Sequence, residues 1–231
     1  MRIEFDEDKH EYTVNGVKVP SVSEILAPLS ADRYSQVNPW VLQAAAERGR
    51  AVHEAAQLMD YGFDPDEDFS VNGYLIAYQD FLSSTNVEWI YAEKIVGADR
   101  YLQDGTHSVL YAGTLDRYGY INGQAAIVDI KTYSSLSTDA LLQASCQTAL
   151  YREALLENIP EDEAPDDYFV KRYVLHLKKD GSWRLVDLDK FDSDHGFPGA
   201  SVAMDLMNLW WTLYNAKQAK KKGKKNVDSG K

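Results

Sequence analysis

Three acids and one lysine in the middle of the chain have the types and spacing of a hydrolytic metal site. Glu93 lies in a strand-like segment, Asp116 ends the run Gly113-Thr-Leu-Asp, and one residue separates Asp129 from Lys131. Hard divalent cations select carboxylate oxygens, and such a cation makes water nucleophilic near neutral pH. An ammonium beside carboxylates stays protonated and can stabilise charge on a reacting phosphate. These residues predict metal-assisted phosphodiester hydrolysis.

A hairpin is expected to bring two of these acids together. Asn122-Gly123 stands between two apolar segments and is a strong signal for a two-residue turn. The segments on either side are then neighbouring strands, which carry Asp116 and Asp129. Because side chains alternate along a strand, Asp129 and Lys131 project from the same face. The carbonyl of Ile130, between them, is a further oxygen ligand available from the strand backbone.

The motif of a carboxylate, any residue and a lysine has a plainer interpretation. The chain contains a second one, Glu7-x-Lys9, with no partner acid on an adjoining strand, and acids in strands often just face solvent. Asp129 differs because apolar residues flank it on both faces of its strand, which predicts burial. A buried carboxylate needs a metal, a base or a lysine beside it. The apolar neighbours are Ile127, Val128 and Ile130.

His53 and Thr132 are secondary candidates. His53 falls on the apolar stripe of an expected helix, where a lone histidine is more often a hydrogen-bonded core residue than a ligand. As a ligand, a neutral imidazole would suit manganese better than magnesium. Thr132 directly follows Lys131 and could orient a metal ligand by hydrogen bonding to it.

A polar stripe follows on the next expected helix. Gln143, Gln147 and Tyr151 are spaced by four residues and lie beside an apolar face. They could contact a phosphate or a catalytic carboxylate, and an ordinary solvent-facing edge explains the spacing equally well.

The remaining sequence predicts an α/β fold with a mixed central sheet and helices on both sides. Asn38 and Pro39 are suited to begin a helix, and Ser137 or Thr138 to cap another. The last helix is expected to pack through Val202, Leu206, Leu209, Leu213 and Ala216. In order, the expected elements are a hairpin at 3–19, a short helix at 22–26, a helix from 39 to about 59, an acidic loop at 60–70, a helix at 71–82, strands at 87–97, 107–121 and 124–132, a helix at 139–157, strands at 168–177 and 183–188, and the last helix.

Composition limits the alternatives. The length of 231 residues fits a single domain over 1–216, followed by a basic, disordered tail over 217–231. The net charge of −12 argues against a protein that coats nucleic acid, although the tail holds seven lysines that could contact phosphates. No apolar run of membrane-spanning length and no signal peptide are recognisable, so we expect a soluble, intracellular protein without a membrane partner. The single cysteine, Cys146, excludes a disulfide framework and a four-cysteine cluster.

Taken together, five short motifs resemble the PD-(D/E)XK nuclease superfamily, in its RecB-like branch with Cas4 and phage exonucleases. They occur in the family's order over about 100 residues, and each is weak by itself. The motifs are Gly49-Arg-Ala-Val-His53, the strand glutamate Glu93, Gly113-Thr-Leu-Asp116, Asp129-Ile-Lys131 and Gln147-Thr-Ala-Leu-Tyr151.

The resemblance implies a restriction-endonuclease-like core and a DNase that depends on one or two Mg²⁺ or Mn²⁺ ions. It places His53, Glu93, Asp116 and Asp129 at the metals, Lys131 in catalysis, and Gln147 and Tyr151 in support or DNA contact. Departures from the family are the missing iron–sulfur cysteines of Cas4, which exclude that cluster, the absence of helicase motifs, and Leu115 where the superfamily's name has proline.

We therefore expect a metal-dependent deoxyribonuclease, an exonuclease of recombination or repair, encoded by a phage or prophage and acting in the bacterial cytoplasm. DNA is the expected partner, together with a recombinase, a single-strand annealing protein or a helicase. The alternative is a non-catalytic nucleic-acid-binding or scaffold module with a nuclease fold. A serine or cysteine hydrolase lacks its motifs. Polarity, strand preference, exo- or endonuclease action, DNA or RNA specificity and oligomeric state stay open.

Overall fold

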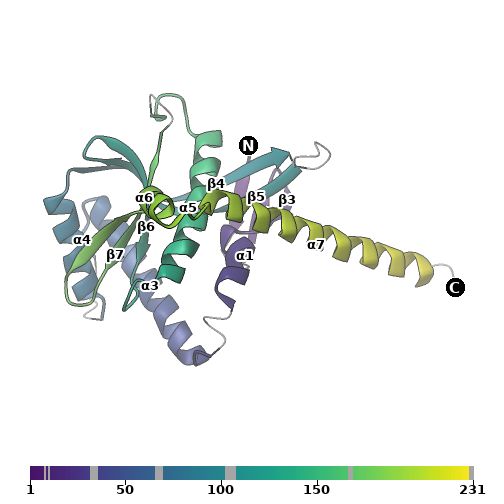
Figure 1. Cartoon of the computed structure of the whole chain (residues 1–231), viewed down its shortest axis with the longest axis horizontal. Helices are drawn as coiled ribbons and strands as arrows, with labels where there is room; N and C mark the ends of the chain where they lie inside the picture. Colours follow the sequence, from purple (N-terminus) through teal and green to yellow (C-terminus); the bar gives the residue numbers. More distant parts are fainter. Residues whose placement is uncertain are drawn as a thin grey trace.

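A computed structural model describes residues 1–7, 9, 11–31, 36–65, 70–101, 108–165 and 169–228 of the protein (Figure 1). The expected starts of two strands, at 107 and 168, and residues 66–69 of the expected acidic loop lie outside these ranges. In chain order the elements are β1 (Ile3–Asp6), β2 (Glu11–Val14), β3 (Val17–Val19), α1 (Val22–Leu26), the 3₁₀-helix η1 (Ala27–Leu29), α3 (Pro39–Asp60), α4 (Asn72–Ser84), β4 (Val87–Tyr101), β5 (Ser108–Ile121), β6 (Gln124–Lys131), α5 (Thr138–Asn158), β7 (Lys171–Leu177), β8 (Trp183–Asp187), α6 (Leu188–His195) and α7 (Gly199–Asp228).

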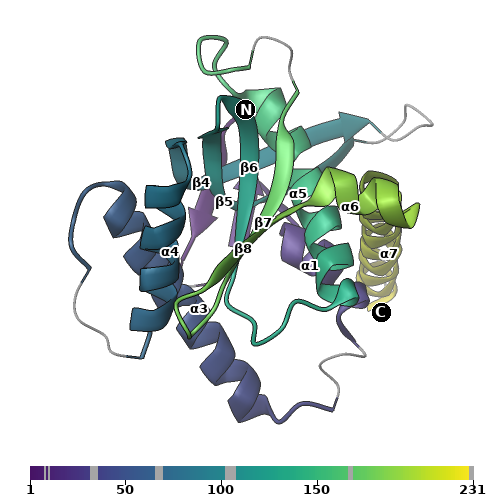
Figure 2. The same cartoon turned by 60° about the vertical axis from the view of Figure 1, so that its left-hand side comes forward.

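The strands form two sheets. A small sheet has the order β1-β2-β3, and a central sheet has the order β4-β5-β6-β7-β8. All pairs in the central sheet are antiparallel except β6 with β7, which are parallel. A parallel pair needs a crossover, and α5 supplies it between these two strands (Figure 2). The predicted α/β class with a mixed sheet is therefore confirmed.

Helices cover both faces of the central sheet. One buried apolar cluster joins β4 and β5 to α1, α5 and α7, and a second joins β6 and β7 to α3 and α4. Strand β6 contributes to both clusters, with Ala125 and Ile127 in the first and Val128 and Ile130 in the second. This alternation confirms that β6 is buried on both faces, as its apolar sequence predicts.

The local signals that begin the elements are satisfied as expected. The Asn38 side chain accepts a hydrogen bond from the Trp40 amide, and the Ser137 side chain accepts one from the Ala140 amide. Asn122 and Gly123 have φ angles of 51° and 80°, the left-handed conformation that a tight hairpin turn requires. The β5–β6 hairpin that carries Asp116 and Asp129 is thus set by its turn.

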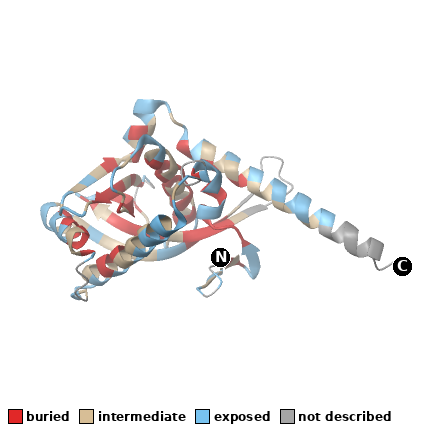
Figure 3. Ribbon diagram, turned by 90° about the horizontal axis from the view of Figure 1, so that it is seen from below, coloured by how far each residue is buried: buried red, intermediate tan, exposed pale blue. Residues whose placement is uncertain are grey.

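The predicted buried face of α7 is wrong in its outer half. Ala203 and Met207 are fully buried, whereas Leu209 and Leu213 are 50% and 52% exposed. The helix extends away from the other elements toward the C-terminus, and most of its residues from 212 to 220 are exposed (Figures 1 and 3). Its packing also uses Trp211, whose indole donates a hydrogen bond to the Leu110 carbonyl. Two apolar stripes overlap on this helix, and sequence periodicity alone cannot decide which one packs.

The lysine-rich segment expected to be disordered is helical as far as Asp228. Lysine and alanine are good helix formers, and lysines near a helix C-terminus interact favourably with its dipole. Residues 229–231 lie outside the described ranges. Among the residues that the structure describes, no helix has the length and apolar character needed to cross a bilayer.

Candidate metal centre

The centre lies where β5 and β6 separate. The two strands are paired from their turn as far as Arg117 and Val128, and Asp116 and Asp129 are the next residues on each strand. Beyond this point the Asp116 carboxylate replaces the strand ladder, because its Oδ2 accepts a hydrogen bond of 2.7 Å from the Ile130 amide. Asp116 is 8% exposed and Asp129 is 2% exposed. The predicted adjacency of the two acids is confirmed.

Glu93 reaches the centre through a distorted stretch of β4. The β4–β5 register shifts between Trp89 and Tyr91. Further along, Ala92 pairs with Arg117 and Lys94 pairs with Leu115, which places Glu93 across from Asp116. Glu93 has a φ of 49°, a conformation that residues other than glycine rarely adopt. Strain of this kind persists where the surroundings hold it, and it is common at functional sites.

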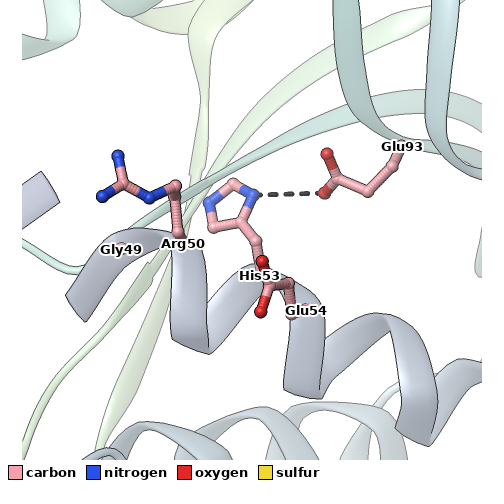
Figure 4. A pocket seen from close by; sticks show the side chains of 5 residues that line it. All are labelled: Gly49, Arg50, His53, Glu54 and Glu93. Atoms are coloured by element: carbon pink, nitrogen blue, oxygen red, sulfur yellow. Dashed lines mark hydrogen bonds and ion pairs between the residues drawn. The ribbon is translucent and has the colours of Figure 1, made fainter. Parts of the chain in front are cut away.

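His53 approaches from α3, on the opposite side of β6 from α5. Its Nδ1 lies 3.2 Å from Glu93 Oε1 (Figure 4). The same atom lies 3.8 Å from Asp116 Oδ1, and Nε2 lies 3.1 Å from the Ile130 carbonyl oxygen. The carbonyl can only accept, so it fixes the proton on Nε2 and turns Nδ1 toward the carboxylates. Burial lowers the pKa of His53, but the charges of Asp116 and Glu93 outweigh it and raise that pKa to about 9.

These three side chains could hold a metal ion. One ligating atom from each of His53, Glu93 and Asp116 lies within 4.8 Å of the other two. A single cation in contact with all of them would require distances of this size. His53 and Glu93 also border an open pocket of about 290 Å³, with Gly49, Arg50 and Glu54 (Figure 4). The pocket gives the candidate centre access to solvent and to a substrate.

Asp129 and Lys131 form a second, adjoining group. Lys131 Nζ donates a hydrogen bond of 2.8 Å to Asp129 Oδ1. Asp129 Oδ2 is buried without a hydrogen-bond partner among the described residues, so it remains able to accept a cation. Burial raises the pKa of Asp129 to about 6, while the Asp129 carboxylate, despite burial, raises the pKa of Lys131 above its usual value. Near neutral pH the pair is therefore a carboxylate and an ammonium.

Two residues of the predicted polar stripe on α5 extend this group. The Lys131 ammonium lies 3.4 Å from Gln147 Oε1, and Gln147 Nε2 lies 3.5 Å from the Tyr151 hydroxyl. Tyr151 is 4% exposed, and burial raises the pKa of its hydroxyl, which stays protonated. Gln143 is half-buried one turn earlier on the same helix. The α5 face thus orients the amine of Lys131 from the side opposite α3.

The structure brings most of the expected site residues together, and their roles in metal binding and catalysis stay predictions. Asp129 is not among the three residues whose ligating atoms form the close group. The Ile130 carbonyl, expected as a metal ligand, contacts His53 instead, although its second lone pair remains. Thr132 is buried, and its Oγ1 lies 4.0 Å from the point that a Cβ on Gly49 would occupy, so it faces α3.

Sequence reasoning missed Arg117 and Asp60. Arg117 is fully buried, and its Nη1 donates a hydrogen bond of 3.1 Å to Glu93 Oε1. Its Nε donates one of 2.6 Å to Asp60 Oδ2, at the end of α3. A charged residue inside the apolar segment Tyr111–Ile121 was the available signal, because a buried guanidinium needs carboxylate partners.

Comparisons with known proteins add little to this geometry. No protein-family model matches the chain, and no curated protein matches it. Among solved structures, the crystal structure of SSO0001 is similar to this chain, with 12% identity, a TM-score of 0.40 and coverage of 85% of this chain and 78% of that one. A likeness this distant does not indicate a function.

Proposed function

We propose that the protein is a metal-dependent deoxyribonuclease of the PD-(D/E)XK type. The observation that carries the proposal is the meeting of the His53, Glu93 and Asp116 ligating atoms within 4.8 Å, directly beside the Asp129–Lys131 pair. Oxygen and imidazole donors of this kind suit Mg²⁺ or Mn²⁺, with the histidine favouring Mn²⁺. The single cysteine, Cys146, is buried in the core and cannot form an iron–sulfur cluster by itself.

In this proposal the acids and the lysine have different tasks. Glu93, Asp116, His53 Nδ1 and Asp129 Oδ2 would hold one or two ions, and the Ile130 carbonyl would be available as a further ligand. A bound ion supplies Lewis acidity at the phosphate and lowers the pKa of a water molecule.

Lys131 contributes from the protein side. Its ammonium is held between the Asp129 carboxylate and the Gln147 amide oxygen, so its remaining N–H groups can orient the attacking water or stabilise charge on the phosphate. Tyr151 would support this geometry through Gln147, and Thr132 would support it from the α3 side. Gln143 and Gln147 would contact the substrate.

The biological setting is part of the same proposal. We infer exonuclease action on DNA in recombination or repair, in the cytoplasm of a bacterial host, alongside a recombinase, an annealing protein or a helicase. The seven lysines of residues 217–231 would offer a non-specific phosphate contact, since residues 1–216 carry 17 basic and 35 acidic side chains.

Digestion of end-labelled DNA tests the proposal. Single- and double-stranded substrates are incubated with Mg²⁺, Mn²⁺ or excess EDTA, using the wild type, Asp129→Ala and the exposed control Asp205→Ala. We expect hydrolysis only with metal, its loss in Asp129→Ala and its retention in Asp205→Ala. Activity in EDTA, or in Asp129→Ala, would contradict the proposal. DNA binding that is indifferent to metal, with no hydrolysis and no Mn²⁺ binding by calorimetry, would favour the non-catalytic module instead.

A further inference from the structure

A buried chain of polar side chains leads from the core to Glu93. The Arg117 guanidinium is its centre: Nη1 donates 3.1 Å to Glu93 Oε1 and 2.7 Å to the Asp116 carbonyl, and Nε donates 2.6 Å to Asp60 Oδ2. The Arg117 guanidinium therefore contacts the side chain of one candidate ligand, Glu93, and the backbone of another, Asp116.

Asp60 is in turn hydrogen-bonded by Tyr78. Its side chain is 3% exposed, and its Oδ1 accepts a hydrogen bond of 2.6 Å from the Tyr78 hydroxyl. The same hydroxyl accepts one of 3.1 Å from the Trp89 indole. Asp60 ends α3, the helix that also carries His53. The chain of contacts thus ties the end of α3 to β4 and β5, the two strands that supply Glu93 and Asp116.

Stability alone does not explain this arrangement. A buried ion pair gains little over apolar residues of similar size, because both charges lose their hydration. Arg117 also keeps an Nη2 atom that is buried with no hydrogen-bond partner among the described residues. Moreover, Arg117 contacts Glu93, and the Glu93 backbone, with a φ of 49°, has to be restrained by its neighbours.

We propose that Arg117, backed by Asp60 and Tyr78, is the positioning residue for the Glu93 carboxylate. By binding Oε1 from the core side, it fixes the orientation in which Glu93 faces His53 Nδ1 and Asp116. Arginine suits this task because its planar, forked donors reach two carboxylates at fixed angles, which a lysine ammonium cannot do. The inference rests on the proposed metal-dependent function and adds the group that pre-organises its ligands.

The chain offers a matched control for this buried arginine. Arg172 is 3% exposed and also binds two carboxylates, with Nε 2.8 Å from Asp189 Oδ1 and Nη2 2.8 Å from Asp192 Oδ2. Its carboxylate partners belong to α6, and its Nη1 donates a hydrogen bond of 2.9 Å to the Ser145 carbonyl of α5. Among the described residues it contacts none of the candidate ligands. Lysine in its place, like lysine at position 117, removes a buried guanidinium from two carboxylates, but it leaves the contacts of Glu93 unchanged.

The experiment measures Mn²⁺ affinity by calorimetry in the full chain, with folding checked by circular dichroism. The variants are Arg117→Lys, Asp60→Asn and Arg172→Lys. We expect Arg117→Lys to weaken Mn²⁺ binding by about 10- to 100-fold, the usual effect of losing a group that orients a ligand. Asp60→Asn should weaken it less, and Arg172→Lys should leave it unchanged. DNA hydrolysis by Arg117→Lys should recover at high Mn²⁺, because its ligands remain.

The outcomes separate the two proposals. A wild type that binds no Mn²⁺ overturns the proposed function and the positioning role with it. A wild type that binds Mn²⁺, with Arg117→Lys no weaker than Arg172→Lys, overturns the positioning role alone. If Arg117→Lys does not fold, Asp60→Asn decides: unchanged Mn²⁺ affinity in that variant overturns the inference, and weakened affinity supports it.

Discussion

The Asp116 carboxylate accepts the hydrogen bond that the Ile130 amide would otherwise donate to a strand, with Oδ2 and the nitrogen 2.7 Å apart. One acid therefore both completes the sheet where β5 and β6 separate and offers its Oδ1 to the candidate metal. The two functions can be separated by substitution.

We expect Asp116→Ala to lower the free energy of unfolding by about 1–3 kcal/mol, because it leaves the buried Ile130 amide without an acceptor. Asp116→Asn keeps an acceptor oxygen and should lose less stability. Both should lose Mn²⁺ binding, since the negative charge is gone. Urea unfolding in EDTA and Mn²⁺ calorimetry measure the two effects. Equal unfolding free energies for the two variants would contradict the structural role.

Lys131→Ala should reduce the rate of hydrolysis by at least about 100-fold and leave most of the Mn²⁺ affinity unchanged. The amine is placed beside the carboxylates rather than among the metal ligands, so its removal takes away charge stabilisation and not a ligand. Lys171→Ala is a suitable control, because Lys171 forms a comparable ion pair of 3.0 Å with Asp187 away from the centre. Turnover is measured at saturating Mn²⁺. A Lys131→Ala variant as active as Lys171→Ala would speak against the catalytic role.

The pKa of His53 predicts a pH-dependent stability in EDTA. The folded value of about 9 lies above the ordinary 6.5, so the folded state binds this proton more tightly. The resulting stability is fully present below pH 6.5 and is lost as pH rises through 9. The pKa difference corresponds to on the order of 3 kcal/mol. We expect the decline in urea-unfolding free energy between these pH values to flatten in His53→Gln. If the unfolding free energy fell equally steeply with pH in the wild type and in His53→Gln, His53 would not be the source of the pH dependence.

Two glycines of the family-like motifs should respond oppositely to alanine. A Cβ on Gly113 would lie 2.8 Å from Tyr151 Cε1, so Gly113→Ala must displace the Tyr151 ring and should destabilise by about 1–3 kcal/mol. Outside its own helix, the nearest described atom to a Cβ on Gly49 would be Thr132 Oγ1, at 4.0 Å, so alanine inside helix α3 should stabilise by up to about 1 kcal/mol. Thermal unfolding of both variants tests this. A stable Gly113→Ala variant would show that Tyr151 is free to move.

The sequence by itself determined most of the elements, although not helix α6 (Leu188–His195), and one half of the candidate site. Helix starts at Asn38 and Ser137 and the turn at Asn122-Gly123 depend on hydrogen bonds within a few residues, so they are readable locally. The turn fixes the register of β5 against β6, and with it the adjacency of Asp116 and Asp129.

Only the tertiary structure decided the other half. His53 joins the acids because α3 packs on β6, and Glu93 faces Asp116 because the register of β4 shifts near Trp89. The Arg117–Asp60 pair and the choice of the Ala203–Met207 face of α7 likewise depend on which distant surfaces meet. Such contacts result from packing over long sequence separations, and neither side-chain periodicity nor short motifs carry that information.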